Sequence, residues 1–289
     1  MRLSRRLTSV LAGAAAAALL AGCSGDAAPG AASESSPDAP SATALVRAAA
    51  AETDGQGSAR YSLTTSTTVD GADVVFAGEG IYDWKADRGQ TTYDVKVGAV
   101  QQRLVGPDLY LTLPQQKGQF FKLKVADVAS SPLGGTVAPT AQLHTLAAVG
   151  EAERVGEEDV RGEPTTHYRG SYDVARALRG ARGVQTAALR SSLGAAATVP
   201  TAEYDVFLDR AGLLRRLTQT VEVPQADGPP LTVTTRLELY DFGIDVVVNP
   251  PPGASVRDGA PLLQALRNAL PQPSSRPAPP PTAVPSPTP

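Results

Sequence analysis

From residue 61 onward, the chain is dominated by short segments in which hydrophobic and polar residues alternate. Such alternation is typical of β-strands that bury one face and expose the other to water. In the segment 231–240, one face carries Val233, Leu237 and Leu239, and the other carries Thr232, Thr234, Arg236 and Glu238. The pattern predicts a large sheet with one buried and one solvent-exposed face.

The predicted strands form two runs, which are separated by a Ser-, Gly- and Pro-rich break at residues 130–139. The first run comprises residues 61–67, 74–84, 90–96, 100–105, 109–113 and 120–125, with Asp70-Gly71 as a hairpin turn. The second run comprises residues 152–160, 165–171, 203–208, 213–223 and 231–240. Most connections within the runs are too short to hold crossover helices, so we expect antiparallel pairing.

Four segments have helical patterns: residues 43–53, 140–149, 174–197 and 261–270. Ser41 or Thr43 can cap the first helix, and Gly180 and Gly183 interrupt the third. A sheet with one apolar face needs a cover, which the helices can supply from one side. We therefore predict an α+β fold, in which helices cover the concave face of one curved antiparallel β-sheet.

The first residues have the three parts of an export signal. Arg2, Arg5 and Arg6 give a basic start, an Ala-rich apolar run covers residues 11–20, and Leu20-Ala21-Gly22-Cys23 follows. The run is too short to span a membrane, which takes about 20 apolar residues. The four-residue box resembles the lipobox of bacterial lipoproteins. Residues 1–22 are thus predicted to be a signal peptide and Cys23 to carry a covalent diacylglyceryl lipid.

Cys23 is the chain's single cysteine, so no disulfide can form within the chain. Two acyl chains on Cys23 suffice for lasting membrane attachment. The alternative is a soluble secreted protein with an incidental cysteine. Residues 23–41 are predicted to be a flexible tether, residues 42–270 a single ligand-binding domain, and residues 271–289 a Pro-rich disordered tail. The tail is expected to be a spacer, or alternatively a ligand for a domain that binds proline-rich segments.

Composition and motifs argue against several functions. The net charge is −3 and forms no basic stripe, and Trp84 is the single tryptophan, so nucleic acid is not an expected partner. No nucleophile elbow, phosphate loop or metal-ligand spacing occurs, so we expect no enzyme, no metal and no cofactor beyond the lipid on Cys23. His144 and His167 lack ligand-spaced partners.

Two clusters of charged residues can be explained by ordinary structural roles. Glu157, Glu158 and Asp159 lack the spacing of a calcium loop and are expected at a solvated strand end. A set of arginines falls in the third helical segment: Arg176, Arg179, Arg182 and Arg190. A solvated helix face is their ordinary role, whereas at a cavity mouth they could hold the phosphate of an anionic lipid.

Several segments together resemble the LppX/LprG-type lipoproteins, which share their fold with the LolA and LolB carriers. They are residues 103–110, residues 155–168, residues 204–209 with the Gly212 turn, and residues 240–243 followed by Val246, Val247 and residues 250–252. These segments span nearly all of the predicted domain in the family's order. Phe207 stands where family members often carry tryptophan.

The resemblance implies that residues 42–270 form a LolA-like, half-open β-barrel, whose hollow face accepts acyl chains of a lipid, glycolipid or lipoprotein. The side chains predicted to line it are Leu63, Leu111, Phe121, Val206, Leu217, Val233 and Leu237. Ordinary core packing is the alternative for each of them. The expected protein is a monomeric, extracytoplasmic, membrane-anchored carrier or holder with a lipid or glycolipid ligand and a possible envelope protein partner. The alternative is a non-catalytic interaction or stress-sensing module with a packed core that binds a protein or wall partner.

Overall fold

The structure is a computed structural model. It describes residues 40–69, 72–95, 97–129, 142–181, 186–187, 189–190, 199–223 and 230–269. The chain separates into two units, Met1–Ala39 and Pro40–Pro289, and all described residues belong to the second unit. The predicted signal peptide, lipidated Cys23, most of the tether, the Asp70-Gly71 turn and the tail lie outside the described residues.

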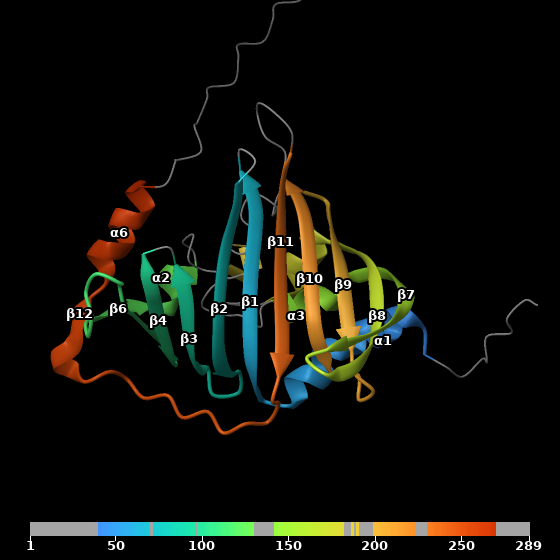
Figure 1. The fold of residues 1–289 in the computed structure, drawn as a ribbon, viewed down its shortest axis with the longest axis horizontal. Coiled ribbons are helices and arrows are strands. Elements are labelled where there is room, and N and C mark those ends of the chain that lie inside the picture. The colour runs from blue at the N-terminus through green and yellow to red at the C-terminus, as the bar shows by residue number, and fades with distance from the viewer. Residues whose placement is uncertain are drawn as a thin grey trace, which may run out of the picture. The chain divides into compact units, whose positions relative to one another are not determined.

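Within the described ranges, twelve strands form one sheet, in the order β12-β6-β5-β4-β3-β2-β1-β11-β10-β9-β8-β7 (Figure 1). The first run is β1 (Ser58–Val69), β2 (Ala72–Asp83), β3 (Arg88–Val95), β4 (Gly98–Val105), β5 (Asp108–Leu111) and β6 (Phe120–Lys124). The second is β7 (Val149–Val160), β8 (Glu163–Asp173), β9 (Thr201–Leu208), β10 (Leu214–Val223) and β11 (Leu231–Tyr240). Pairing of β1 with β11 joins the two runs.

The predicted antiparallel order is confirmed, with one addition at the edge. A short strand, β12 (Val256–Asp258), pairs in parallel with β6. The predicted alternation also holds in the sheet centre, where Leu63 lies opposite Leu237 and both side chains face the core. The open, curved antiparallel sheet predicted from the sequence is therefore present.

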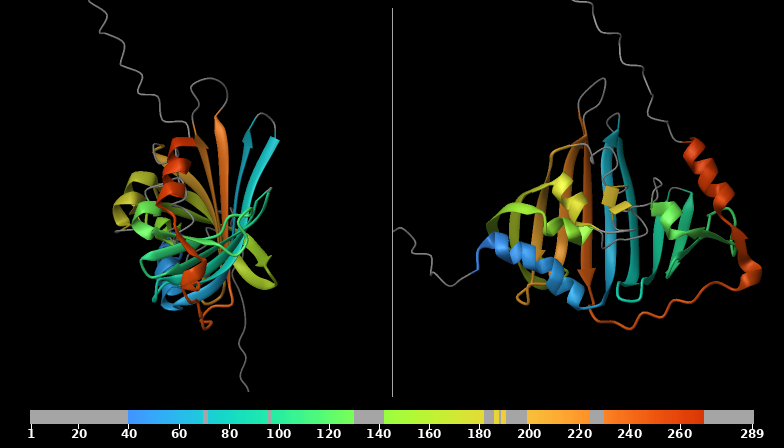
Figure 2. Two further views of the ribbon diagram at one scale, coloured as in Figure 1. Left: turned by 90° about the vertical axis from the view of Figure 1, so that its left-hand side faces the viewer. Right: turned by 180° about the vertical axis from the view of Figure 1, so that it is seen from behind.

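Helices lie against the concave face of the sheet (Figure 2). They are α1 (Ala42–Gly55), α3 (Leu143–Leu146) and α4 (Val174–Gly180), and α2 (Val125–Ala129) directly follows β6. Ser41 caps α1 by accepting a hydrogen bond from the amide of Ala44. The predicted helix 140–149 is shorter than expected, because Val149 already pairs with Tyr172 as the first residue of β7.

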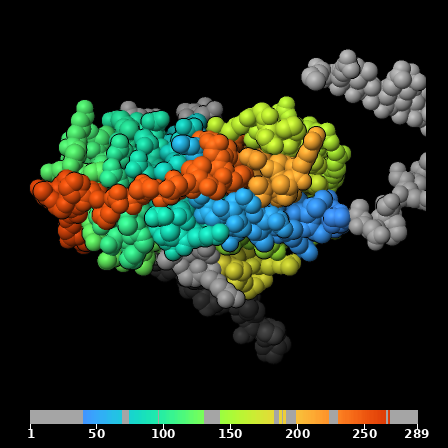
Figure 3. Space-filling model, turned by 90° about the horizontal axis from the view of Figure 1, so that it is seen from below, coloured from blue at the N-terminus to red at the C-terminus, as the bar shows by residue number. Residues whose placement is uncertain are grey.

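An extended strap, residues 241–255, runs from the end of β11 across one end of the sheet to β6 (Figure 3). It includes one 3-10 turn, η4 (Gly253–Ser255). The hydroxyl of Ser58 donates to the carbonyl oxygen of Ile244 at 2.6 Å, and Val246 and Val248 are buried. The strap delivers β12 and α6 (Ala260–Ala269) to the β6 end of the sheet.

On the convex face, the tip of the β7–β8 hairpin is held against the sheet by ion pairs. Arg161 occupies the left-handed turn position with φ of 54° and donates to Glu238 at 2.8 Å. Arg216 donates to the other oxygen of Glu238 at 2.9 Å and also pairs with Glu158 at 2.7 Å. Glu238 was predicted on the solvent-exposed face, and these contacts bury it there.

Candidate ligand cleft

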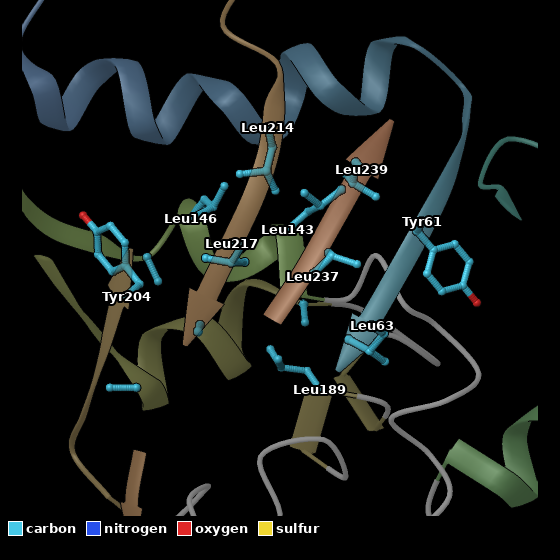
Figure 4. Close-up of a cluster of buried hydrophobic side chains, with 14 of the residues drawn as sticks. Tyr61, Leu63, Leu143, Leu146, Leu189, Tyr204, Leu214, Leu217, Leu237 and Leu239 are labelled. Carbon is cyan, nitrogen blue, oxygen red and sulfur yellow. The ribbon is translucent and has the colours of Figure 1, made fainter. Parts of the chain in front are cut away.

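One half of the concave face is packed shut. Leu217 of β10 and Leu237 of β11 are fully buried against Leu143 and Leu146 of α3 (Figure 4). Helix α1 packs along β7, β9 and β10, where Thr53 accepts a hydrogen bond from the amide of Leu214. Among the described residues, α1 and α3 pack directly on this part of the sheet.

The predicted cavity residues belong to one hydrophobic core that extends along the sheet from β5 and β6 to β9. Leu63, Leu111, Val206, Leu217 and Leu237 are buried in it, and Phe121 and Val233 are partly buried against it. The structure thus brings all seven into one cluster. None of them lines the cleft described next. Their contact with a ligand stays a prediction.

The other half of the concave face has a cleft of about 1040 Å³. It lies where α1, α3, the β2–β3 turn, the β4–β5 turn and the β6–α2 junction meet. The lining side chains are Arg47, Ala50, Ala51, Asp54, Tyr82, Trp84, Lys85, Asp87, Leu104, Gly106, Pro107, Lys124, Val125, Ala126, Asp127, Leu143, His144 and Ala147. This volume is at the upper end of the usual range for small-molecule sites.

The cleft has an apolar floor. Tyr82 and Leu104 come from the concave face of β2 and β4, Val125 starts α2, and Leu143 starts α3. Each of the four side chains is at most 7% exposed. Small side chains on α1, Ala50 and Ala51, leave the space above this floor unfilled. An apolar floor with free space above it is suited to binding hydrocarbon chains.

One wall is fixed by the β2–β3 turn, which is bonded to the end of α1. The indole nitrogen of Trp84 donates to the carbonyl oxygen of Asp54 at 2.7 Å, and the Trp84 amide donates to Gly57 at 3.1 Å. Lys85 donates to the carbonyl oxygen of Gly55 at 3.3 Å. These bonds satisfy carbonyl groups that the end of a helix leaves free. Trp84 is thereby held as a rigid wall of the cleft.

The rim of the cleft carries charged and titratable side chains. Arg47 donates to the carbonyl oxygens of Val149 and Gly150, and so covers the start of edge strand β7. His144 lies half-buried in the wall. Burial lowers the pKa of His144, and the carboxylate of Asp54 opposes that shift only in part. The histidine is therefore neutral at neutral pH, which suits an apolar cleft.

Other candidates from the sequence lie elsewhere. His167 is on the convex face, where its ring stacks on Phe207 and its Nε2 atom contacts the carboxylate of Asp205 at 2.7 Å. The helical arginines Arg176, Arg179 and Arg190 are exposed and do not line the cleft, while Arg182 lies outside the described residues. In the described ranges, no three His, Cys, Asp or Glu side chains are grouped as metal ligands. No helix in these ranges has the length and hydropathy of a membrane span.

The cleft residues were missed in the sequence because they carry no shared motif. Trp84 was noted only as a lone aromatic residue and His144 only as a helix residue. The alanines of α1 were the available signal, since a covering helix with small side chains leaves space beneath it.

Comparison with known proteins finds similar folds. No family model matches the chain. An uncharacterized 31.2 kDa protein of Streptomyces griseus, from the rplA-rplJ intergenic region, is 30% identical over 129 residues, which is 44% of this chain and 40% of that protein. The match thus spans less than half of that relative.

Among solved structures, the lipoprotein LppX of Mycobacterium tuberculosis is similar with a TM-score of 0.49 and 15% identity, covering 72% of this chain and 97% of LppX. LprF of Mycobacterium bovis has a TM-score of 0.48 and 12% identity, covering 73% and 97%. A LolA superfamily protein of Nitrosomonas europaea has a TM-score of 0.32 and 12% identity, covering 73% and 96%. These similarities concern the fold alone.

Proposed function

We propose that this chain is a lipid-anchored, extracytoplasmic protein that binds a hydrophobic ligand in the cleft between α1, α3 and α2. The ligand class is the acyl chains of a lipid, a glycolipid or a lipoprotein. The protein acts as a carrier or holder and performs no covalent chemistry.

The observation that carries the proposal is the cleft of about 1040 Å³ with its floor of Tyr82, Leu104, Val125 and Leu143. Burial of hydrocarbon stabilises a complex by about 0.8 kcal/mol per CH₂ group. A single long acyl chain in such a cleft therefore gains enough free energy to offset much of its transfer out of a bilayer.

The anchor and the location are proposed from the sequence. The lipobox ending at Cys23 supports a diacylglyceryl anchor, and the export signal supports a place in the cell envelope. The proposed partners are the membrane, reached through the anchor, and the lipid ligand. An envelope protein that loads or unloads the carrier is a further possible partner.

Energy transfer from Trp84 tests the proposal in the full chain. Trp84 is the chain's single tryptophan and lines the cleft, so cis-parinaric acid bound there should quench its emission. We expect saturable quenching in the wild type. Ala51→Arg places a long charged side chain into the cleft from an exposed position on α1, and should weaken binding by about tenfold or more.

Ala48→Arg is the matched control, since Ala48 is exposed on the same helix and does not line the cleft. It should bind like the wild type. Equal binding by both variants, or no saturable quenching in the wild type, would contradict the proposal.

A packed interaction module remains the second candidate because of one observation: Val206, Leu217 and Leu237 are fully buried under the helices. Such a module would bind no lipid and would respond to a protein or wall partner. The quenching experiment separates the two, because a packed module would leave Trp84 emission unchanged.

A further inference from the structure

A second cavity adjoins the cleft at the β6 end of the sheet. This groove has a volume of about 920 Å³. It is lined by Lys122, Leu123, Lys124, Asp127, Val256, Arg257, Asp258, Ala260, Leu263, Gln264, Arg267 and Asn268. Its walls are thus β6, β12, α2 and α6, which lie together at one end of the molecule in Figure 1.

The groove is held in shape at both ends of α6. At the start, the amide of Gly259 donates to the carbonyl oxygen of Lys122 at 2.9 Å, and a Cβ atom at Gly259 would meet the side chain of Leu123 at 2.7 Å. In the middle, Leu263 is 4% exposed. Near the end, Arg267 donates to the carbonyl oxygen of Asp127 at 3.0 Å. Helix α6 is therefore packed in place along the groove.

The groove is positively charged. Four of its lining side chains are basic and two are acidic. Lys122 and Lys124 share one carboxylate, that of Asp108, at 2.8 and 2.6 Å. The hydrogen bonds of Arg257 in the described part of the chain go to the carbonyl oxygens of Ala254 and Val256, both at 3.3 Å. Carbonyl contacts leave the charge of a guanidinium uncompensated, and such a group binds phosphate well.

The groove and the cleft are neighbours, because Lys124 and Asp127 line both. One cavity has an apolar floor and the other has basic walls. An amphiphile with an anionic head group fits this pair of cavities. Its hydrocarbon chains match the apolar cleft, and its head group matches the basic groove beside the cleft.

We propose that the groove between β6 and α6 holds the phosphate of an anionic lipid whose acyl chains occupy the adjoining cleft. The inference rests on the proposed function and adds a substrate class to it. The arginine that does this is Arg257, rather than Arg176, Arg179 or Arg190 of the third helical segment.

Calorimetric titration of the full chain tests the groove with three probes: dioctanoyl phosphatidic acid, dioctanoylglycerol and inorganic phosphate. The two lipids share their acyl chains and differ in the phosphate. We expect the wild type to bind the phosphatidic acid at least about tenfold more tightly than dioctanoylglycerol. Arg257→Gln should remove this preference and leave dioctanoylglycerol binding unchanged.

The matched control is Lys117→Gln, which removes one exposed charge that lines neither cavity. It should keep the preference. A second variant, Arg257→Glu, should also lose the preference, since Arg257 is exposed and its replacement breaks only carbonyl contacts.

Retention of the preference in the arginine variants would overturn the inference, as would equal binding of both lipids by the wild type. Binding of inorganic phosphate as tightly as phosphatidic acid would assign the groove to free phosphate and also overturn it. Binding of neither lipid would instead contradict the carrier function itself.

Discussion

The two halves of the concave face differ in how the helices meet the sheet. Over β9, β10, β11 and β1, leucines of α3 and the apolar side of α1 fill the space above Leu217 and Leu237. Beside β2 and β4, Ala50 and Ala51 of α1 line a cleft together with Tyr82 and Leu104. Leucines of α3 thus pack against one region of the sheet, whereas small side chains of α1 border the open space at the other.

The two halves of the concave face therefore have different roles. The packed half supplies the stability of the domain, whereas the cleft half provides space for a ligand and borders the basic groove. Three predictions test this division, beginning with the largest expected effect.

Leucine truncation should cost more in the packed half than in the cleft half. Leu217 is fully buried, and we expect Leu217→Ala to lower the free energy of unfolding by about 4 kcal/mol, since it leaves a closed void. Leu104 borders an existing cleft, so Leu104→Ala should cost only about 2 kcal/mol. Urea unfolding measures both. Equal costs, or a larger cost for Leu104→Ala, would contradict the division.

The ion pairs behind the packed half should give it a pH-dependent stability. Burial raises the pKa of Glu238, but hydrogen bonds from Arg161 and Arg216 outweigh burial and hold this pKa below the usual 4.5. A carboxylate with a lowered pKa stabilises the fold above its unfolded value and loses this effect as pH falls through the folded value.

Glu238→Gln should therefore lower the melting temperature at neutral pH, and the gap to the wild type should close below about pH 4. Thermal unfolding over a pH series measures this gap. Glu79→Gln is the control, since Glu79 is exposed and its distance to Arg161 is 3.9 Å. A gap for Glu238→Gln that stays constant into acid would show that the ion pairs do not stabilise the fold.

A smaller effect is expected in the cleft half, from His144. Its pKa is lowered by burial, so the folded protein resists protonation and becomes less stable as pH falls below the usual histidine value of 6.5. Protonation also places a charge in an apolar cleft. We expect the affinity for an uncharged ligand such as dioctanoylglycerol to fall between about pH 7 and about pH 5.

His144→Leu should remove this pH dependence, and His167→Gln should keep it, because His167 lies on the convex face. Calorimetry at a series of pH values measures the affinities. The account of the cleft would be wrong if His144→Leu retained the full pH dependence.

Much of the fold could be predicted from local pattern. The alternation of Leu237, Glu238 and Leu239 placed a strand and its faces, and Ser41 marked the start of α1. Each of these features depends on neighbours in sequence. The β7–β8 hairpin followed in the same way, although its turn is shorter than predicted and Pro164 already pairs with Asp159.

Other features depend on distant contacts and were not predictable. Strand β12 has three residues and no period of its own, and its parallel pairing with β6 follows from the length of the strap and from the close contact of Gly259 with Leu123. Helix α2 begins at Val125, where the sequence pattern predicted the end of a strand.

The cleft could not be predicted, because a cavity forms where side chains from several distant segments leave space unfilled. Leu104 and Leu217 are equivalent in the sequence pattern, since both are apolar residues on the buried face of a strand. What differs is the set of distant residues around each one, which the local pattern does not contain. The seven predicted cavity residues were therefore chosen by a criterion that finds buried strand positions and does not distinguish core from cleft.

Native mass spectrometry tests the central claim most directly. The full chain with Cys23→Ser, which removes the predicted covalent lipid, would be expressed in a host with diverse envelope lipids and analysed beside an organic extract. The account predicts an added mass equal to a lipid that also appears in the extract, and its loss in the folded Ala51→Arg variant. A chain without added mass, with no lipid in the extract, would contradict the carrier function.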